Sequence, residues 1–248
     1  METVVSIVGT GQMTKRAAEL LAAGVDGELG LRLLDRDLRA AEQAADRVRR
    51  AAPEVRVTAG TVDALDVEAC ATAVASSDLV VLGAGPFLRT TEPVVRACVR
   101  AGVDLLDIGD DAEAAQAALA LDAEVAAAGV CVSIGCGASP GLTNVLAADA
   151  ADALDEVERI DVGWVVGDEG PQELGDAVLQ HWVHCVAGSC STSSWMDLER
   201  MDDSTGAACA AFARLALRDR TPGVRAPEDW VTLPELREAL DAVRAVPA

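Results

Sequence analysis

The sequence predicts an α/β protein whose main domain is a doubly wound parallel sheet, followed by a small, reduced α+β second domain. Short, continuous apolar runs alternate with Ala-rich amphipathic stretches over the first 135 residues. A glycine turn follows the first run, and the regular alternation of apolar runs and amphipathic stretches ends near residue 140. Continuous apolar strands separated by helices are typical of a parallel sheet that is covered on both faces.

The expected elements of the main domain alternate in order along the chain. We expect strands at residues 4–8, 31–34, 55–58, 79–82, 105–107 and 130–134. Helical patterns lie between them, near residues 13–23, 38–51, 67–75, 91–101 and 112–128. Because crossover connections are right-handed, these elements form a sheet that binds ligands at the carboxyl ends of its strands.

The second part of the chain has a less regular pattern. We expect a helix over 142–152, a strand over 157–166, an amphipathic helix over 172–186, a loop over 188–194, and helices near 204–217 and 234–245. We therefore divide the chain into a main domain at 1–140, a reduced substrate or oligomerisation domain at 141–220, and a C-terminal segment at 221–248.

The composition argues against several classes of function. The formal net charge is −21, and the sequence has two Phe and no Tyr, so we expect no nucleic-acid partner. No apolar run is long enough to span a membrane, and the N-terminus lacks the pattern of a signal peptide. The seven cysteines contain no CxxC pair, which predicts reduced thiols in a cytoplasmic protein.

A glycine turn follows the first expected strand, in the segment Gly9-Thr10-Gly11-Gln12-Met13. Gly9 permits the tight turn, and Gly11 lets a pyrophosphate approach the N-terminus of the next helix, where free N–H groups favour an anion. The third small position of this fingerprint holds Thr14 instead of Gly or Ala. Strand, turn and helix together predict a dinucleotide-binding loop, and the alternative is an ordinary glycine turn.

An acidic residue closes the second expected strand, as a dinucleotide site requires. Asp35 lies 24 positions after Gly11, near the ~20 expected for a carboxylate that binds the adenosine ribose 2′-OH. Arg36 follows directly and is suited to a ribose 2′-phosphate. The sequence therefore predicts NAD or NADP as the cofactor, with NAD favoured by Asp35.

Loops after the later strands contribute further candidate residues. The fourth strand is followed by a glycine-rich loop that allows close approach to ribose or nicotinamide, with Gly83, Gly85, Pro86 and Phe87. Three carboxylates, Asp107, Asp110 and Asp111, follow the fifth strand and are suited to bind an amine or to carry a proton, with Asp110 as the candidate proton carrier. The alternative is that Asp110 and Asp111 cap the next helix. Cys136 follows the sixth strand as a candidate acid or base, or as an inert small residue.

Two blocks resemble those of saccharopine dehydrogenase-like proteins, a family that includes saccharopine reductases and carboxynorspermidine dehydrogenases. They are DLVVLGAGPFLRTTEPVVRACVRAGVDLLDIGDD, from residue 78, and AGVCVSIGCGASPGLTN, from residue 128. The resemblance extends over residues 1–187, and residues 223–228 resemble the closing segment of the family. It implies a Rossmann domain, a second domain with the substrate pocket, and a C-terminal segment that returns to the first domain.

The resemblance also implies roles for single residues. The cofactor would be bound by Gly9, Gly11, Gln12, Met13, Asp35, Arg36, Gly85, Pro86, Phe87 and Gly137, with Cys136 near the nicotinamide. Two departures from the family pattern are Thr14 and the short stretch 150–220, which leaves little chain for the usual second sheet. The substrate pocket is therefore reduced, shared with a partner subunit, or lost.

The two histidines lie three positions apart in the helix expected at 172–186. His181 and His184 would then share one helical face, with Cys185 and Cys190 nearby. The spacing matches no zinc pattern, and we predict no metal. Because imidazole titrates near neutral pH, His181 is the first candidate for the catalytic proton carrier, before Cys136 and Asp110.

These residues together predict an NAD(P)-dependent oxidoreductase that transfers a hydride to or from a C–N bond of a small amino acid or imine. One alternative is a nucleotide-binding regulatory protein whose catalytic domain is eroded, and another is a reductase of C=C or C=O bonds. Trp164, Trp182 and Trp195 lie in the short second part of an aromatic-poor chain. Such residues predict surface buried between subunits, and hence a homodimer.

Overall fold

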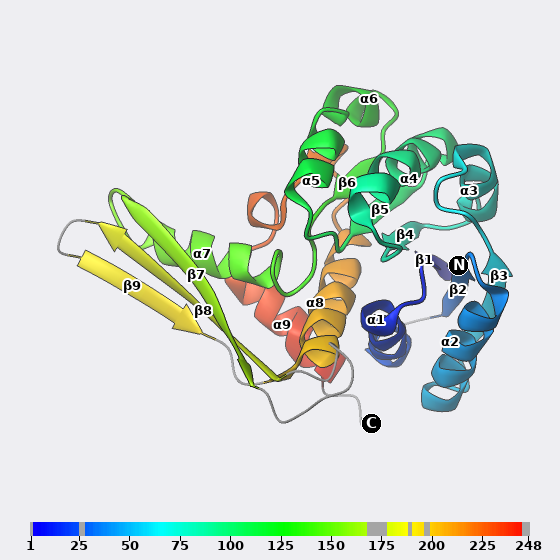
Figure 1. Cartoon of the computed structure of the whole chain (residues 1–248), viewed down its shortest axis with the longest axis horizontal. Helices are drawn as coiled ribbons and strands as arrows, with labels where there is room; N and C mark the ends of the chain where they lie inside the picture. The colour runs from blue at the N-terminus through cyan, green and yellow to red at the C-terminus, as the bar shows by residue number, and fades with distance from the viewer. Residues whose placement is uncertain (1, 25–27, 168–177, 188–189, 196–198, 245–248) are drawn as a thin grey trace.

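The computed structural model describes residues 2–24, 28–167, 178–187, 190–195 and 199–244 (Figure 1). Its main sheet has seven strands, all parallel, in the order β11-β6-β5-β4-β1-β2-β3. The strands are β1 (Thr3–Val8), β2 (Leu29–Asp35), β3 (Arg56–Thr61), β4 (Leu79–Leu82), β5 (Asp104–Asp107), β6 (Cys131–Ser133) and β11 (Gly223–Arg225). The doubly wound sheet is therefore confirmed.

Strand β1 is central, and the direction of the strand order reverses beside it. Val5 is in register with Leu31 of β2 on one side and with Leu79 of β4 on the other. In open α/β sheets, a crevice forms outside the carboxyl ends of the strands where the order reverses. The fold thus puts the loops after β1, β2 and β4 together at one edge.

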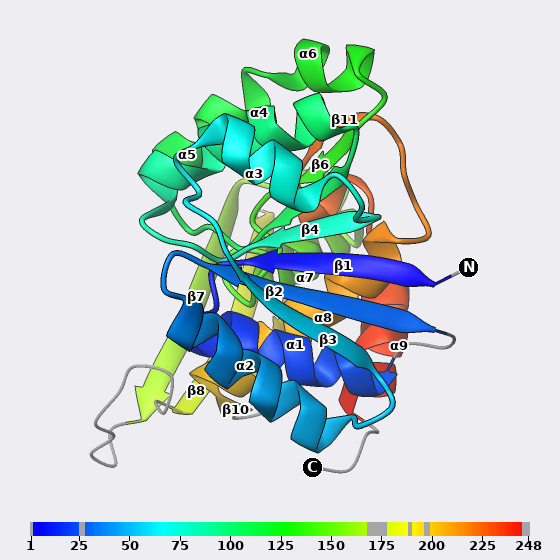
Figure 2. The same cartoon turned by 90° about the vertical axis from the view of Figure 1, so that its right-hand side faces the viewer.

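Helices cover both faces of the main sheet (Figure 2). One face carries α1 (Gln12–Gly24), α2 (Leu38–Ala51), α8 (Met201–Ala216) and α9 (Leu233–Arg244), and the other carries α3 (Val67–Val74), α4 (Phe87–Ala101), α5 (Ala112–Leu119) and α6 (Asp122–Ala127). Each face buries its own apolar core. Among the described residues, no helix is long and apolar enough to cross a membrane.

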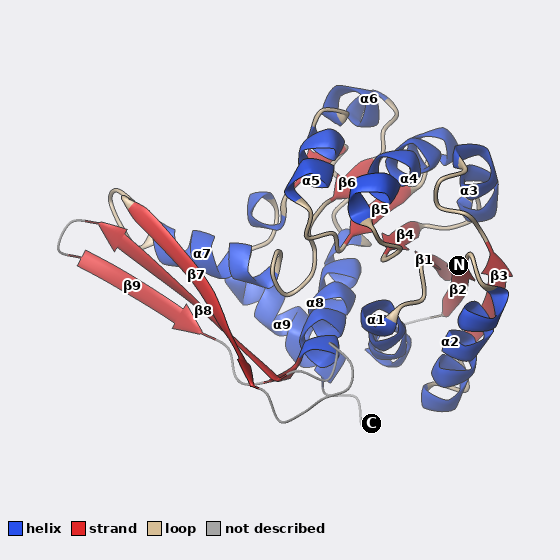
Figure 3. Cartoon of the chain, in the orientation of Figure 1, coloured by secondary structure: helices blue, strands red, loops and turns tan. Residues whose placement is uncertain are grey.

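A second, antiparallel sheet lies beside α7 (Leu142–Asp152), away from the main sheet (Figure 3). It consists of β7 (Arg159–Gly167), β8 (Val178–Ala187), β9 (Cys190–Trp195) and β10 (Glu199–Arg200), with β8 pairing with the other three. The hydroxyl of Thr192 donates to the carbonyl oxygen of Ala150 at 2.9 Å, and Val183 and Cys185 are fully buried. The sheet is thus attached to α7 by one of its faces.

Two expectations for the second part are wrong. The predicted helix at 172–186 is strand β8 from residue 178 onward, and the predicted loop at 188–194 is strand β9 from residue 190 onward. The residues before 178 and the pair 188–189 lie outside the described residues. In β8, buried Val183 and Cys185 alternate with partly exposed His184, which is the two-residue period of a strand with one covered face.

A smaller correction concerns the helix expected at 112–128, which is divided into α5 and α6. The N–H of Leu121 donates to the carbonyl of Ala118 at 2.9 Å, so the last turn of α5 tightens and the chain changes direction before Asp122. The helices expected at 142–152, 204–217 and 234–245 are confirmed as α7, α8 and α9, and the strand expected at 157–166 is confirmed as β7.

Candidate functional site

The loop between β1 and α1 contains two glycines with different roles. Gly9 has a φ of +90°, and a Cβ atom there would overlap Ala84 in the loop after β4. The fold itself therefore requires glycine at position 9. Gly11 has no positive φ, and no atom lies within 4 Å of where its Cβ would be. Gly11 faces open space, so only an approaching ligand would require the absence of a side chain.

Thr14 explains how the loop departs from the usual fingerprint. Its side chain is buried, and its hydroxyl donates to the carbonyl oxygen of Gly9 at 2.6 Å. A Cβ atom at Gly83 would overlap the methyl group of Thr14. The third glycine normally permits close packing between helix and strand. In this chain the small residue is Gly83 instead, so the larger Thr14 is accommodated.

Asp35 at the end of β2 is bound to the glycine loop. Its Oδ2 accepts hydrogen bonds from the backbone N–H of Thr10 at 2.7 Å and from the Thr10 hydroxyl at 2.8 Å. Burial opposes ionisation, but these bonds and those from the N–H groups of Asp37 and Arg36 outweigh it and lower the pKa of Asp35. The carboxylate is therefore charged at neutral pH.

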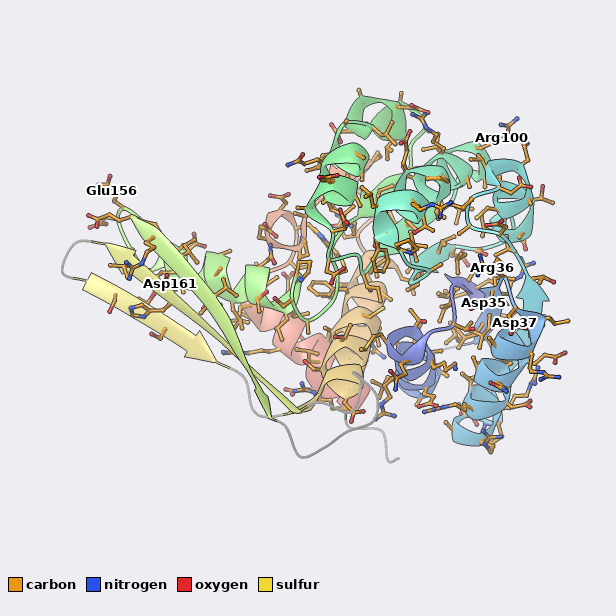
Figure 4. All side chains as sticks on the ribbon, in the orientation of Figure 1. Asp35, Arg36, Asp37, Arg100, Glu156 and Asp161 are labelled. Atoms are coloured by element: carbon orange, nitrogen blue, oxygen red, sulfur yellow. The ribbon has the colours of Figure 1, made fainter. Side chains whose placement is uncertain are left out.

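A cavity of about 330 Å³ lies over this loop, where the ends of β1, β2, β3 and β4 meet. Two arginines line it: exposed Arg36 follows β2 beside Asp35 and Asp37 (Figure 4), and exposed Arg89 lies in the first turn of α4. The cavity thus combines an ionised carboxylate, two guanidinium groups and the backbone of the glycine loop. Such a set suits a ligand with hydroxyl and phosphate groups.

Seven of the residues predicted for the cofactor line this one cavity: Gly9, Gly11, Asp35, Arg36, Gly83, Gly85 and Pro86. Like Gly11, Gly85 has no atom within 4 Å of where its Cβ would be. Four others, Gln12, Met13, Phe87 and Gly137, are not among the lining residues. The Phe87 ring instead lies against Gly109, where a Cβ atom would be 3.0 Å from it.

The structure describes the side chains of two of the three proton-carrier candidates. Cys136 is fully buried, and burial raises the pKa of its thiol well above the usual value. Its environment favours the interpretation as a small core residue. Asp110 is exposed, whereas Asp111 caps α5 by accepting hydrogen bonds from Glu113 and Ala114. The side chain of His181 lies outside the described part of the structure.

His184 has a structural partner within the second sheet. Its Nδ1 lies 2.7 Å from the hydroxyl oxygen of Ser193, its neighbour across the β8–β9 ladder. Because β8 is a strand, the helical spacing that predicted a shared face for His181 and His184 does not apply.

Asp107 is the buried member of the three carboxylates predicted at the end of the fifth strand. It is buried at the end of β5 and accepts hydrogen bonds from the Thr91 hydroxyl at 2.8 Å and from the backbone N–H of Gly109. Burial raises its pKa to about 6, against the opposing effect of these bonds. A buried carboxyl with a raised pKa, at the carboxyl end of a parallel strand, is a candidate functional group.

Several residues that do line the cavity are absent from the predicted cofactor set. Thr10 lies inside the fingerprint that the sequence displays, but its bond to Asp35 depends on how the two loops meet. Arg89 carried a possible signal, since a basic residue directly after a glycine-rich strand end is placed to reach an anion. Asp63 follows β3, which the glycine fingerprint does not cover.

Comparison with known proteins identifies a family and solved structures with a similar fold, among them the two described next. Residues 5–132, more than half of the chain, match the family described as the saccharopine dehydrogenase NADP binding domain. Saccharopine dehydrogenase (L-Glu forming) from Saccharomyces cerevisiae is similar with a TM-score of 0.56 and 19% identity, over 70% of this chain and 37% of that chain. GenD2 from gentamicin A biosynthesis, solved in complex with NAD, is similar with a TM-score of 0.56 and 18% identity, over 99% of this chain and 94% of that chain. This chain thus matches well under half of the yeast enzyme, and at these identities the likeness concerns the fold.

Proposed function

The chain belongs to the saccharopine dehydrogenase NADP-binding family, and from this premise we propose an NAD(P)-dependent oxidoreductase that transfers a hydride to or from a C–N bond of a small amino acid or imine. The observation that carries the proposal is the pair Gly11 and Gly85. Both line the same cavity, both lack positive φ, and both have open space where a side chain would be. Neither a positive φ nor a steric contact of the Cβ atom requires glycine at these positions, whereas a ligand in contact with the backbone does.

The residues around the cavity fit a dinucleotide part by part. When bound, the nicotinamide supplies the hydride acceptor or donor. The backbone beside Gly11 and the start of α1 would hold the pyrophosphate, because helix N-termini favour anions. Asp35 would accept the hydrogen bond of the adenosine ribose, and Gly85 would leave room for the other half of the cofactor.

We propose that NAD(H) is preferred over NADP(H), because the charged Asp35 repels a 2′-phosphate. Arg36 and Arg89 line the same cavity and act in the opposite sense. Asp35→Asn keeps an oxygen for Thr10 but removes the charge, so it should shift the ratio of the two dissociation constants toward NADPH by about tenfold. Calorimetric titration measures both constants, and wild-type protein that binds NADPH more tightly would show that the arginines dominate.

Cofactor binding is tested by Gly11→Val and Gly85→Val. Both variants should stay close to the melting temperature of the wild type, because no atom lies within 4 Å of where the added Cβ would be. Each should weaken NADH binding by at least ~30-fold, because the side chain occupies the space of the ligand. Ala127→Val, on an exposed position of α6, is the matched control and should change neither quantity. Unchanged affinity in both glycine variants would contradict the proposed site.

The reaction is tested by steady-state turnover with a panel of amino acids, keto acids with ammonium, enones and aldehydes. Oxidation of an amino acid, or reduction of an imine, supports C–N chemistry, and turnover of enones or aldehydes alone would replace it with a C=C or C=O reductase. His181 is still our first candidate for the proton carrier. His181→Ala should then lower turnover by about 10²–10⁴ while leaving NADH affinity unchanged.

A second candidate function is a nucleotide-binding protein without turnover. The observation in its favour is that neither Cys136, which is buried, nor Asp110, which is exposed, lines the cavity. In that case the protein would bind NADH with the Gly11 dependence described above, yet convert no member of the substrate panel.

The second sheet supports the further proposal of a homodimer. Ile160 and Val162 on β7 are 46% and 43% exposed, and among the described strands β7 pairs only with β8. Exposed apolar side chains on an unpaired strand edge are suited to contact with a second copy. Light scattering should give the mass of a dimer for the wild type and of a monomer for Val162→Lys. A wild-type monomer at micromolar concentration would refute the proposal.

A further inference from the structure

A second cavity, of about 510 Å³, lies between the C-terminal part of α8 and helix α9. It shares no lining residue with the cavity over the glycine loop. Its walls include the apolar side chains of Leu215, Val231, Ala239 and Ala242. The family match ends at residue 132, so this cavity is formed by a part of the chain that the match does not cover.

Two residues that line this cavity each carry a buried donor atom without a partner. Arg214 is 9% exposed, and neither its Nη1 nor the Nε1 of Trp230 has a hydrogen-bond partner. Within the described part of the chain, these are the two buried side-chain nitrogen or oxygen atoms in that state. Buried donors are nearly always paired in folded proteins. That both exceptions occur in one cavity indicates a site for an external acceptor.

The indole of Trp230 is held in a fixed position. The guanidinium carbon of Arg225 lies 3.9 Å from the centre of its ring, and the Phe212 ring packs at 6.2 Å on a tilt of 49°. Arg225 is itself fixed, because its guanidinium donates to the Ser133 hydroxyl at 3.1 Å and to the carbonyl of Asp219 at 2.7 Å. The N–H of Trp230 is therefore preorganised as a donor, which favours binding.

The carboxylates of the cavity have other partners or are exposed. Asp219 accepts hydrogen bonds from Thr221 and pairs with Arg225 at 2.9 Å, and Glu235 accepts from Thr232. Glu238 is exposed on α9. They do not neutralise Arg214, but three acidic side chains near one cavity, in a chain of net charge −21, disfavour a doubly charged ligand.

We propose that this cavity binds the carboxylate group of a small monocarboxylic acid with an apolar body. The guanidinium of Arg214 and the indole N–H of Trp230 would donate to its two oxygens, and the apolar walls would cover the remainder. A carboxylate matches the planar donor geometry of arginine and carries a single charge. The volume is within the range of small-molecule sites, about 300–1,000 Å³.

The test uses 4-fluorobenzoate as the probe, observed by fluorine NMR on the full chain with saturating NADH. We expect broadening and a shift of the probe signal with the wild type, and none with 4-fluorobenzyl alcohol, which has the same body without the charge. Arg214→Met should weaken binding by at least ~30-fold and Trp230→Phe by about tenfold, since each removes one donor. Arg237→Gln, an exposed arginine of α9 outside the cavity, is the matched control and should bind as the wild type does.

Folding is measured separately, by thermal unfolding without the probe. Arg214→Met should unfold at or above the wild-type temperature, because it removes a buried charge that has no partner. A large fall in that temperature would mean that Arg214 supports the fold, and the proposal would be wrong. It would also be overturned if the probe failed to bind at millimolar concentration, or if the alcohol bound equally well. Inorganic phosphate that displaced the probe at lower concentration would assign the site to another class of anion and overturn it too.

Discussion

Strand β4 of the main sheet and strand β7 of the second sheet differ in what covers them. All four residues of β4 are buried, with helices on both faces of the sheet. On β7, Ile160 and Val162 are nearly half exposed although both are strongly apolar. A strand covered on both faces needs an unbroken apolar run, whereas a strand covered on one face is encoded by alternation and by its neighbours. The first kind of strand can therefore be predicted from the sequence, whereas the second is easily predicted as a helix or a loop.

The largest effect on stability is expected in the loop between β1 and α1 of the main sheet. Gly9→Val should lower the free energy of unfolding by roughly 3–6 kcal/mol, because it forces a β-branched residue into positive φ and into Ala84. Urea unfolding measures the loss, with Gly11→Val as the control that should stay within ~0.5 kcal/mol of the wild type. Equal losses in the two variants would mean that the two glycines do not have the separate roles assigned to them.

The next largest effect on unfolding free energy is expected at a buried position of the main sheet, and it is compared with an exposed position of the second sheet. Leu106 on β5 is completely buried, and Leu106→Ala should cost about 2–4 kcal/mol of unfolding free energy through the cavity it leaves. Val162→Ala on β7 should cost less than ~0.5 kcal/mol, as for other exposed positions. Both variants are measured by urea unfolding. A cost above 1 kcal/mol for Val162→Ala at low protein concentration would show that β7 is covered after all.

A buried carboxyl makes the stability of the main sheet depend on pH. The folded pKa of Asp107, about 6, exceeds its ordinary value of 3.8. The folded state therefore binds more protons between those values, and this carboxyl lowers stability as the pH rises through that window. Asp107→Asn should remove a change on the order of 1–3 kcal/mol between pH 4 and pH 7. Urea unfolding at both pH values tests this, and an identical difference in wild type and variant would contradict the raised pKa.

The smallest expected effect concerns the β8–β9 pair. His184→Ala removes the contact with the Ser193 hydroxyl and should cost about 0.2–1 kcal/mol of stability, the usual contribution of a cross-strand pair. Ser193→Ala should cost the same, and the double variant should cost little more than either single one. Full additivity of the two costs would mean that the pair does not interact.

The sequence by itself determined the parallel sheet and the loop that begins the candidate site. The run at 79–82 is apolar throughout, Leu105 and Leu106 begin the next strand, and the glycine turn with Asp35 follows a known spacing. These features depend on residues close together in the chain. Seven predicted residues consequently line one cavity.

Tertiary structure alone decided the remainder. Contacts between separate loops produce three features of the site. They are the packing of the larger Thr14 against the small Gly83, the hydrogen bond from Thr10 to Asp35, and the raised pKa of Asp107. Strand β8 became a strand because β7 and β9 pair with it on either side, an effect that its own sequence does not contain. The physical reason is common to all of these: burial and pairing are properties of the neighbours that the fold supplies, and local sequence specifies only one member of each contact.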